Sequence, residues 1–457
     1  MSTSDFSSLK LHPDLLKNLG SLGYESMTPI QALSLPAILD GKDVIGQGKT
    51  GSGKTAAFGL GLLHKLNVKS YKVQSMVLCP TRELADQVAA EIRKLARAIH
   101  NIKILTLCGG APFGPQIGSL EHGAHIVVGT PGRIEEHLRK RTLKLEHVEM
   151  LVLDEADRML DMGFQDAIDN IVEKVPANRQ TLLFSATYPQ EIEDIAMRVM
   201  HNPITVNAPE AHEASTIKQC FYQANTDDER MSALRILLAK HKPDSALVFC
   251  NTKLDTQDVA DELVHYGFYA LAIHGDLDQR ERDQALIRFA NKSVSVLVAT
   301  DVAARGLDID ALDLVVNFNV AHDPEVHVHR IGRTGRAGRS GIAVTLFSDR
   351  ETRKLEALEL DVVADVLPSD TYLDKPIKRP TMTTLKIDGG KKQKLRPGDI
   401  VGGLTGQGGI PGDKIGKITV SSNWSYVAVE SGLVKTALKK IQNDKLKGKT
   451  FRVRILS

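Results

Sequence analysis

The chain has 457 residues, of which 42% are hydrophobic and 25% charged, with four cysteines and a formal net charge of +2. This length favours about three domains, and the composition is that of a soluble globular protein. An apolar run of about 18 residues is lacking, as is a basic start followed by an apolar stretch, which argues against a membrane span or a secretory signal. The cysteines are far apart and form no CxxC pair, so neither a disulfide framework nor a zinc site is expected, and a cytoplasmic location fits.

The net charge is unevenly distributed along the chain. From Thr381 onward there are fifteen Lys and Arg against five Asp and Glu, a local balance of +10 that leaves about −8 for the preceding residues. A basic tail on an acidic body suggests a separate module that binds a polyanion. A solvated surface with skewed charge explains the same numbers, and charge alone leaves the two readings even.

The first motif in the chain is a glycine-rich loop. Residues 48–55 read GKTGSGKT, follow an apolar strand expected at Asp43–Ile45 and precede a helix expected at Ala56–Lys65. This is GxxxxGK[ST] in its required strand-loop-helix context, in which backbone N–H groups curl around phosphates. Lys54 is expected to neutralise the β and γ phosphates, and Thr55 to serve Mg²⁺. The spacing disfavours a glycine turn without chemical consequence.

Short apolar runs then alternate with amphipathic stretches such as Arg82–Ile99. This alternation predicts βαβ units and a parallel sheet covered by helices on both faces. The expected strands are Ser75–Pro80, Ile104–Gly109, His125–Thr130, Met150–Asp154 and Thr181–Ser185.

An acidic cluster, Asp154-Glu155-Ala156-Asp157, ends the fourth of these strands. An acid at that place, downstream of a phosphate loop, is positioned to meet the same metal ion. Asp154 is therefore expected to bind Mg²⁺, and Glu155 to orient and deprotonate the attacking water. A helix N-cap is the ordinary alternative for adjacent acids at a strand end.

The second half repeats the alternation, so a second doubly wound domain is expected. The boundary is placed in the polar stretch Asn207–Ser215, which gives domains at 1–207 and 208–367. The expected strands are Ala246–Asn251, Ala270–His274, Val294–Thr300, Leu314–Asn319 and Ile342–Phe347.

Residues 329–336 read HRIGRTGR and place three arginines at a spacing of three, separated by glycines that keep the loop thin. His322, His327 and His329 nearby raise the possibility of a metal site. Only Asp323 and Glu325 could complete such a ligand set, so that reading is disfavoured.

A second break spans Pro368–Pro380, and a smaller domain is expected at 381–457. Its expected strands are Thr384–Ile387, Lys417–Val420, Tyr426–Val429 and Phe451–Ile455, with helices at Asp399–Leu404 and Leu433–Ile441. The order βαββαβ describes an RRM-like α+β fold. The patterns thus predict two tandem doubly wound α/β domains with parallel sheets and an RRM-like tail.

Together, the phosphate loop and the Asp-Glu-Ala-Asp cluster resemble the DEAD-box family of ATP-dependent RNA helicases, and the match continues across nearly all of residues 6–345. Gly23 and residues 28–31, with Phe6, resemble the family's adenine-reading motif, in which a glutamine amide offers both a donor and an acceptor to adenine. The resemblance implies that the two doubly wound domains are RecA-like, and it implies ATP and Mg²⁺ as cofactors. It implies ATP contacts at Phe6, Gln31, Gly48, Thr50, Gly51, Ser52, Gly53, Lys54, Thr55 and Asp308.

The same resemblance assigns catalysis and coupling. Arg333 and Arg336 are implied to reach the γ-phosphate, with Arg336 as the arginine finger, and they join Glu155 and Lys54 as the catalytic set. Ser185-Ala186-Thr187 resembles the motif that links hydrolysis to strand separation. The implied coupling residues are Asp157, Ser185, Thr187 and His329.

Several segments resemble the family's RNA-contacting motifs. Most follow an expected strand, at the carboxyl edge where open α/β sheets bind ligands, and their residue types suit phosphate and sugar contacts that read no bases. The implied residues are Pro80, Thr81, Arg82, Gly110, Thr130, Gly132, Arg133, Asn251, Gln279, Arg282, Thr300 and Asp301.

The tail resembles that of the bacterial DbpA subfamily, which implies a hairpin of 23S ribosomal RNA as the partner, during large-subunit assembly. The matching basic residues are Lys391, Lys392, Lys447, Lys449 and Arg452. The tail has few aromatic residues, so phosphate or shape contacts are expected to dominate over base stacking. A general RNA helicase, an ATP-independent RNA chaperone and a DNA-unwinding motor are the alternatives.

Overall fold

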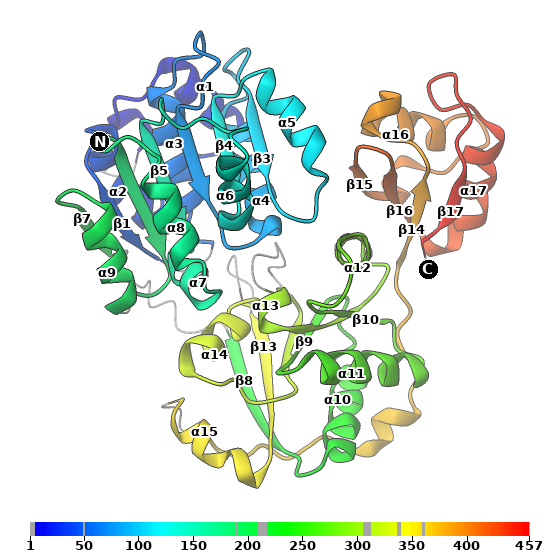
Figure 1. Ribbon diagram of the computed structural model, residues 1–457. Helices are drawn as coiled ribbons and strands as arrows, with labels where there is room; N and C mark the ends of the chain where they lie inside the picture. Colours follow the sequence, from blue (N-terminus) through cyan, green and yellow to red (C-terminus); the bar gives the residue numbers. More distant parts are fainter. Residues whose placement is uncertain are drawn as a thin grey trace. The chain divides into compact units, whose positions relative to one another are not determined.

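The computed structural model describes residues 5–48, 51–188, 190–207, 217–304, 312–335, 340–358 and 362–456. The described residues fall into two compact units, one ending at Asn207 and one beginning at Ile217. They contain a seven-stranded, a six-stranded and a four-stranded sheet (Figure 1). Among the described helices, none has the length and apolar character that a bilayer crossing requires.

The first sheet is parallel throughout, in the order β3-β4-β2-β5-β6-β1-β7. Its strands are β1 (Val44–Gln47), β2 (Ser75–Leu78), β3 (Ile104–Leu107), β4 (Ile126–Gly129), β5 (Met150–Asp154), β6 (Gln180–Ser185) and β7 (Ile204–Asn207). Its helices are α1 (Pro13–Ser21), α2 (Pro29–Leu39), α3 (Lys54–Lys65), α4 (Arg82–Leu95), α5 (Phe113–Glu121), α6 (Pro131–Arg139), α7 (Ala156–Asp161), α8 (Gln165–Val172) and α9 (Gln190–Val199).

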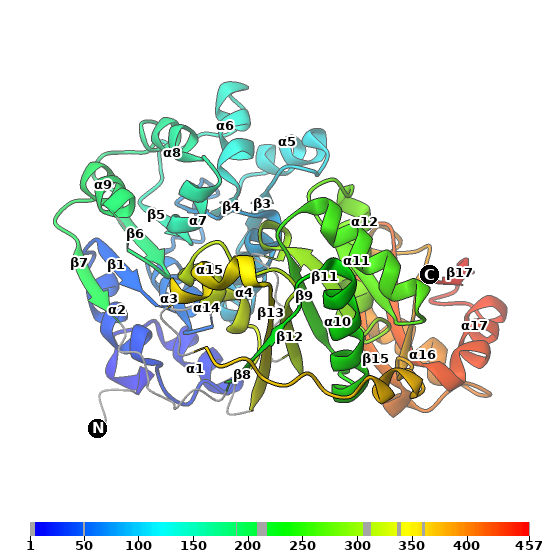
Figure 2. The same ribbon diagram turned by 90° about the horizontal axis from the view of Figure 1, so that it is seen from below.

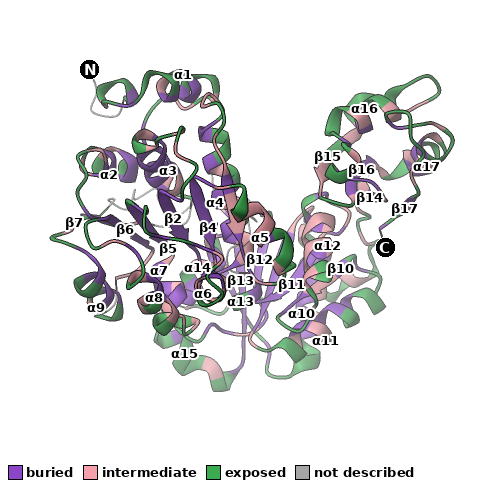
Figure 3. Cartoon of the chain, turned by 45° about the horizontal axis from the view of Figure 1, so that its top comes forward, coloured by how far each residue is buried: buried purple, intermediate pink, exposed green. Residues whose placement is uncertain are grey.

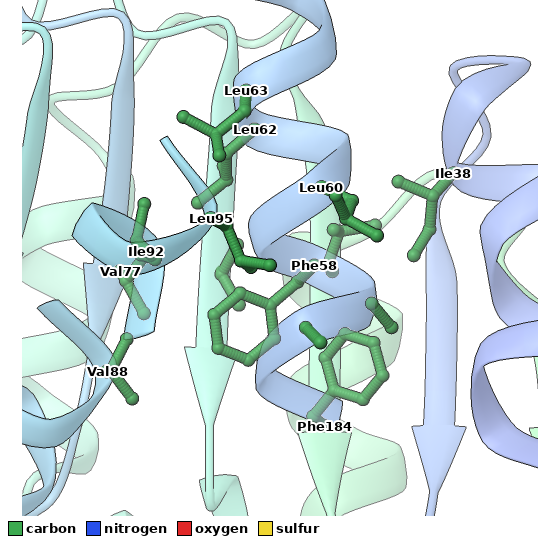
Figure 4. Packing of buried hydrophobic residues seen from close by; sticks show 14 of the residues in the cluster. Ile38, Phe58, Leu60, Leu62, Leu63, Val77, Val88, Ile92, Leu95 and Phe184 are labelled. Carbon is green, nitrogen blue, oxygen red and sulfur yellow. The ribbon is translucent and has the colours of Figure 1, made fainter. Parts of the chain in front are cut away.

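Helices cover both faces of this sheet, because its strands are apolar on both sides. Helices α1 to α4 share one buried cluster with the sheet, and α6 to α9 share the other. On the first face the rings of Phe58 and Phe184 lie 5.5 Å apart, surrounded by aliphatic side chains of α2, α3 and α4 (Figure 4). The strands are buried while the outer helix faces are exposed (Figure 3), so the polar edge at the strand ends is left for function.

The second sheet is also parallel, in the order β10-β11-β9-β12-β13-β8. Helices α10 and α11 pack on one of its faces (Figure 2). The strands are β8 (Ile217–Gln223), β9 (Ala246–Cys250), β10 (Ala270–Ile273), β11 (Val296–Thr300), β12 (Leu314–Asn317) and β13 (Gly341–Phe347). The helices are α10 (Asp227–His241), α11 (Lys253–His265), α12 (Gln279–Ala290), α13 (Asp301–Ala304), α14 (Pro324–Ile331) and α15 (Thr352–Glu356).

The tail is an antiparallel sheet in the order β15-β16-β14-β17, with α16 and α17 sharing an apolar core with it. Its elements are β14 (Met382–Ile387), α16 (Pro397–Thr405), β15 (Ile415–Val420), β16 (Ser425–Glu430), α17 (Val434–Asn443) and β17 (Val453–Ile455). The predicted βαββαβ order is confirmed. The short 3-10 helices of the described residues are η1 (Phe6–Ser8), η2 (Asp349–Glu351), η3 (Asp370–Asp374), η4 (Lys391–Gln393), η5 (Gly412–Lys414) and η6 (Ser431–Leu433).

The predicted fold class is confirmed, and two strands that were not expected complete the sheets. Strand β7 lies at the edge of the first sheet and β8 at the edge of the second. Both mix polar with apolar residues, and on edge strands one side is partly exposed, so neither forms the continuous apolar run that marked the others. The predicted boundary continues into residues 208–216, outside the described residues, and the predicted domain limits stay predictions.

Candidate functional site

The glycine-rich loop joins β1 to the first turn of α3. Gly51 and Gly53 have φ of 83° and 94°, in the left-handed region that glycine adopts without strain. A Cβ on Gly53 would lie 2.4 Å from the Gln31 Nε2 atom, so a side chain cannot be accommodated there. Lys54 begins the helix and is only 6% exposed. Thr50 lies outside the described residues.

The polar groups of this loop fit a bound phosphate. The Lys54 Nζ donates to the Gly48 carbonyl at 2.5 Å, so its ammonium lies over the loop that the phosphates would enter. The Ser52 hydroxyl is buried without a hydrogen-bond partner among the described residues. Such orphaned groups are rare in native interiors, and a phosphate oxygen at a helix N-terminus would satisfy this one.

Gln31 lies in the first turn of α2 and is buried against this loop. Its Oε1 accepts from the Thr28 backbone N–H at 2.9 Å, and its Nε2 donates to the Gly53 carbonyl at 3.1 Å. An amide carries two donor hydrogens and two acceptor lone pairs, so one of each remains for a ligand. Gln31 thus ties an amide suited to adenine directly to the phosphate loop. Thr28, the N-cap of α2, was not among the predicted contacts.

Phe6 belongs to η1 and packs into the first apolar cluster rather than into solvent. Its ring meets that of Tyr24 edge-on, with centroids 6.3 Å apart, and it is 4% exposed. The Tyr24 hydroxyl in turn donates to Glu91 of α4 at 2.5 Å. These contacts fix the N-terminal segment beside α2, so the role predicted for Phe6 toward adenine stays a prediction.

The acidic cluster occupies the end of β5. Asp154 is 3% exposed, and burial raises the pKa of its carboxyl to about 7 despite the opposing effect of the Lys54 charge. Glu155 follows with φ of 50° and ψ of 54°, the left-handed conformation, and serves as the N-cap residue of α7. The N-cap position of Glu155 is thus observed, and its predicted action on water stays a prediction.

Asp154 and Thr55 stay the residues predicted to hold Mg²⁺. A buried carboxylate is costly unless a cation balances it, which the raised pKa of Asp154 expresses. Groups of three or more His, Cys, Asp or Glu able to bind a metal are absent from the described residues. A site with one carboxylate and one hydroxyl suits Mg²⁺, which retains waters and takes further oxygens from phosphates.

The end of β6 connects the acidic cluster with the phosphate loop. Thr187 donates to the Asp157 Oδ2 through its backbone N–H at 3.2 Å and through its hydroxyl at 3.0 Å. The Ser185 carbonyl accepts from the Gly48 N–H at 3.0 Å. Strand β6 lies between β5 and β1, so the predicted coupling motif is in contact with both halves of the ATP site.

The RNA-contacting residues predicted in the first unit gather at one sheet edge. They follow β2, β3 and β4, and these three strands are neighbours in the sheet. Gly110 has φ of 72°, and the side of Gly132 where a Cβ would lie is open. Pro80, Thr81, Arg82 and Thr130 complete this group.

The Arg133 guanidinium is less available for RNA contact than the sequence suggested, because it is bound within the protein. Its guanidinium donates to the Ala111 carbonyl and the Gln116 Oε1, both at 3.0 Å, and pairs with Glu136 at 3.1 Å. These contacts tie α6 to the loop before α5. The role of Arg133 toward RNA stays a prediction, and its observed contacts are with Ala111, Gln116 and Glu136.

The second unit assembles its predicted residues around Arg330, which the sequence did not single out. Arg330 is 1% exposed and donates two hydrogen bonds of 2.7 Å to the Asp301 carboxylate. It also donates to the Asn251 Oδ1 and the Asn319 carbonyl, both at 2.8 Å. One guanidinium thus holds the ends of β9, β11 and β12 in register, with Thr300 immediately before Asp301.

The remaining predicted residues of this unit lie nearby in the fold. Gln279 and Arg282 are in the first turn of α12, which follows β10. Arg333 is 9% exposed, just past α14. Asp308 and Arg336 lie outside the described residues. The roles predicted for Arg333 and Arg336 stay predictions, as does that of His329.

His327, one of the three histidines of this segment, is a structural group. The His327 Nε2 lies 3.0 Å from the Gln219 Oε1, and burial lowers the pKa of its imidazole to about 4. A neutral, hydrogen-bonded ring needs no metal, and the described residues contain no cluster that would complete a metal site.

The predicted cations of the tail converge at one end of its sheet. Ile387, the last residue of β14, pairs with Val453, the first of β17. Residues that follow β14 and residues that precede β17 therefore lie at the same end. These residues, Lys391, Lys392, Lys447, Lys449 and Arg452, are all exposed.

Comparisons with known proteins agree with this arrangement. Residues 28–195 match the DEAD/DEAH box helicase family, 229–338 the helicase conserved C-terminal domain, and 384–455 the DbpA RNA binding domain. The chain is 53% identical over 459 residues to the ATP-dependent RNA helicase DbpA of Escherichia coli, covering 99% of both chains. It is 47% identical to the ATP-dependent RNA helicase CshA of Listeria monocytogenes over 78% of this chain and 68% of that one.

A solved structure shows the same fold with ligands. Dbp5 of Saccharomyces cerevisiae, bound to RNA and ADP BeF3, is 30% identical with a TM-score of 0.71, over 78% of this chain and 93% of that one. The matched part corresponds in extent to the two parallel-sheet regions.

Proposed function

The chain belongs to the DEAD-box family of ATP-dependent RNA helicases, in the group that carries a DbpA RNA binding domain, and from this premise we propose that it remodels 23S ribosomal RNA during assembly of the large subunit, with Mg²⁺ as the metal cofactor. The activity class follows from family membership. The proposal concerns the ribosomal RNA partner, Mg²⁺ and the roles of individual residues.

The observation that carries the ribosomal assignment is the tail. It matches the DbpA RNA binding domain over 384–455 and holds a net charge of +10 in a chain whose remainder is acidic. The parallel-sheet units offer glycine, threonine and arginine at their strand ends, which suit sugar and phosphate but read no sequence. Selection of one RNA is therefore assigned to the tail.

The proposed hydrolytic step uses groups of the first unit. Lys54 binds the phosphates, and Asp154 with Thr55 holds Mg²⁺, which supplies a positive charge to the phosphate oxygens when bound. Glu155 accepts the proton of the attacking water. The contact between Asp157 and Thr187 supports a coupling role for the end of β6, because a shift at the acidic cluster moves Thr187 as well.

Steady-state ATP turnover tests this proposal. Turnover of the wild-type chain is measured with large-subunit ribosomal RNA, small-subunit ribosomal RNA and a DNA duplex. We expect half-maximal ATP turnover at the lowest concentration with the large-subunit RNA. DNA is expected to stimulate turnover least, because an RNA groove engages 2′-hydroxyls. Equal half-saturation by all three would contradict the ribosomal assignment. Glu155→Gln is expected to bind ATP and RNA yet to lose turnover.

The RNA segment is identified by crosslinking in cells. The Glu155→Gln chain holds its RNA without turning over, so crosslinking followed by sequencing reports the bound segment. We expect one large-subunit hairpin to dominate, and the signal to disperse in a variant with Lys391, Lys392, Lys447 and Lys449 replaced by alanine. A broad spread of transcripts with the unaltered tail would leave a general RNA helicase as the better description.

A further inference from the structure

One face of the tail sheet is buried against the six-stranded unit. Thr384, Lys386 and Tyr426 project from β14 and β16 on the side away from the tail's own helices, and they are 0%, 1% and 3% exposed. The Thr384 hydroxyl accepts from the Asn291 Nδ2 at 3.1 Å and lies 2.6 Å from the Ser293 Oγ. Both partners belong to the loop that follows α12.

Helix α12 covers the aromatic part of the same face. The Arg280 guanidinium lies 5.2 Å from the centre of the Trp424 ring, and Gln284 hydrogen-bonds to Tyr426. Lys386 fills the remaining space, with its Nζ 4.6 Å from the Trp424 ring centre. In an ordinary RRM this face offers its aromatic rings to bases. Here Tyr426 is buried and Trp424 is half-buried beside Arg280 of α12.

The helical side of the tail offers cations instead. In α17, Val434, Ala437 and Ile441 face the apolar core, and Lys435 and Lys439 stand exposed on the opposite face. These two lysines are at positions i and i+4, which places them side by side on the helix surface. In the described part of the chain, neither forms an ion pair with an acid.

These lysines line a hollow of about 360 Å³ between α17 and the loop after α16. Lys440 holds the loop in place, since its Nζ donates to the Gln407 carbonyl at 2.6 Å and pairs with Asp444 of the same wall. The charges of Lys440 and Asp444 cancel each other. The hollow therefore retains two positive charges, those of Lys435 and Lys439. Gly408 on the opposite wall has φ of 73° and open space where a side chain would be, so a ligand can approach its backbone.

We propose that this hollow is a binding site for the RNA phosphate backbone. RNA binds there while the face of the tail sheet that carries Thr384, Lys386 and Tyr426 stays packed against α12. Lysine is a point-charge binder of phosphate, and two unpaired ammonium groups beside a glycine backbone suit a polyanion that passes over the surface. The site is additional to the cations at the β14–β17 end, and it rests on the proposed use of the tail to bind RNA.

Salt dependence of RNA binding by the full chain tests the site. Each phosphate contact contributes about 0.7 to 0.9 to the slope of log K against log salt. We expect Lys435→Ala/Lys439→Ala to lower that slope by about 1.4 to 1.8, so that the loss of affinity between about 50 and 200 mM salt becomes roughly 7- to 12-fold smaller. Lys435→Glu/Lys439→Glu is expected to weaken binding further.

A matched control removes the same charge elsewhere. Lys69 and Lys72 are exposed and precede β2, at the sheet edge opposite the strand ends that carry the predicted RNA contacts. Lys69→Ala/Lys72→Ala is expected to leave the slope unchanged. If the α17 variant keeps the wild-type slope while RNA still stimulates its ATP turnover, the hollow is not an RNA site. If RNA stimulates the ATP turnover of neither the wild-type chain nor the α17 variant, the proposed function itself fails.

Fluorescence tests the covered face, because Trp424 is the one tryptophan of the sequence. An RNA bound at the hollow leaves the Trp424 environment as it is, so emission is expected to stay constant through the titration. Quenching by RNA in the wild-type chain would show bases stacking on the sheet and would overturn the docked arrangement. Arg280→Ala is expected to change the emission without RNA, which establishes that the signal reports this contact.

Discussion

Arg330 and Asp301 form a bidentate pair inside the second parallel-sheet unit, with both nitrogen–oxygen distances at 2.7 Å. Arg330 is the largest fully buried side chain of the described residues, and its side chain also reaches Asn251 and Asn319. The ends of β9, β11 and β12 therefore depend on one guanidinium, and the ends of β9 and β11 carry predicted RNA contacts.

Replacing this arginine is expected to cost stability rather than a single contact. Arg330→Met leaves the partly buried Asp301 carboxylate and the Asn319 carbonyl without their buried partner, and breaking such a pair destabilises by about 3–5 kcal/mol. Urea unfolding followed by circular dichroism measures the change. Arg353→Met, at an exposed position of α15, is the control and is expected to shift stability by about 0.5 kcal/mol or less. A loss below about 1 kcal/mol for Arg330→Met would mean that the pair does not hold these strands.

His137 is expected to make the stability of the first unit depend on pH. Its ring is fully buried, bonded to Gln116 and Thr142, and burial, assisted by the nearby Arg133 charge, lowers its pKa from 6.5 to about 4. Between these values the unfolded chain binds the proton and the folded chain does not. The free energy of unfolding therefore falls as the pH falls, by up to about 1.4 kcal/mol per pH unit.

Thermal unfolding from pH 7 to pH 4 measures this dependence. His137→Gln retains a polar side chain but cannot titrate, so its stability is expected to fall less steeply over the same window. His327→Gln provides a matched second case, since burial also lowers the pKa of His327 to about 4. Identical pH profiles for the wild-type chain and His137→Gln would show that this ring does not titrate as described.

Glu155 is expected to lower the stability of the folded chain and to be required for ATP turnover. A left-handed backbone costs a residue with a side chain about 1–2 kcal/mol, and glycine avoids that cost while losing about 0.5–1 kcal/mol through its freer unfolded state. Glu155→Gly should therefore raise the unfolding free energy of the nucleotide-free chain by up to about 1 kcal/mol and abolish ATP turnover. Calorimetry of the thermal transition measures the stability change.

The control for this substitution is Arg139→Gly, at an exposed helical position of α6. Glycine is about 1 kcal/mol worse than an ordinary residue there, so stability should fall. A loss of stability in Glu155→Gly equal to that in Arg139→Gly would count against strain at Glu155.

Thr187 is expected to matter more for unwinding than for hydrolysis. Thr187→Ala removes one of its two hydrogen bonds to the Asp157 carboxylate, a contact to a charged group worth about 1.5–3 kcal/mol. Duplex unwinding per ATP hydrolysed is the quantity to measure, and it should fall while turnover persists. Thr187→Ser keeps the hydroxyl and should restore the ratio. An equal loss of both activities in Thr187→Ala would place Thr187 in catalysis rather than in coupling.

Much of the fold could be predicted because buried parallel strands leave a direct signal. Strands such as β5 and β9 are covered on both faces, so the residues before the functional strand end are apolar, and the runs are visible without any alignment. Edge strands lack that requirement, and for this reason β7 and β8 escaped prediction. The phosphate loop was equally visible, since its glycines are dictated by backbone conformation at positions such as Gly53.

The residues that support the site were harder to predict than those expected to bind ligands. Gln116 acts through Arg133 and the Cys108 carbonyl, and its residue type carries no special pattern. Arg330 stood within a recognised motif, yet nothing in its spacing distinguished it from Arg333.

The sequence by itself determined the chemistry of this protein: a phosphate loop, an acid at the right strand end, an arginine motif and a basic tail, each legible because its residue types are dictated locally. Only the tertiary structure decided how the cations are used. Arg330 and Arg133 are held inside by carbonyls and carboxylates, Lys386 is buried on the docked face of the tail, and Lys435 with Lys439 is left exposed. Burial depends on which elements pack together, and that relation between distant residues has no local sequence pattern.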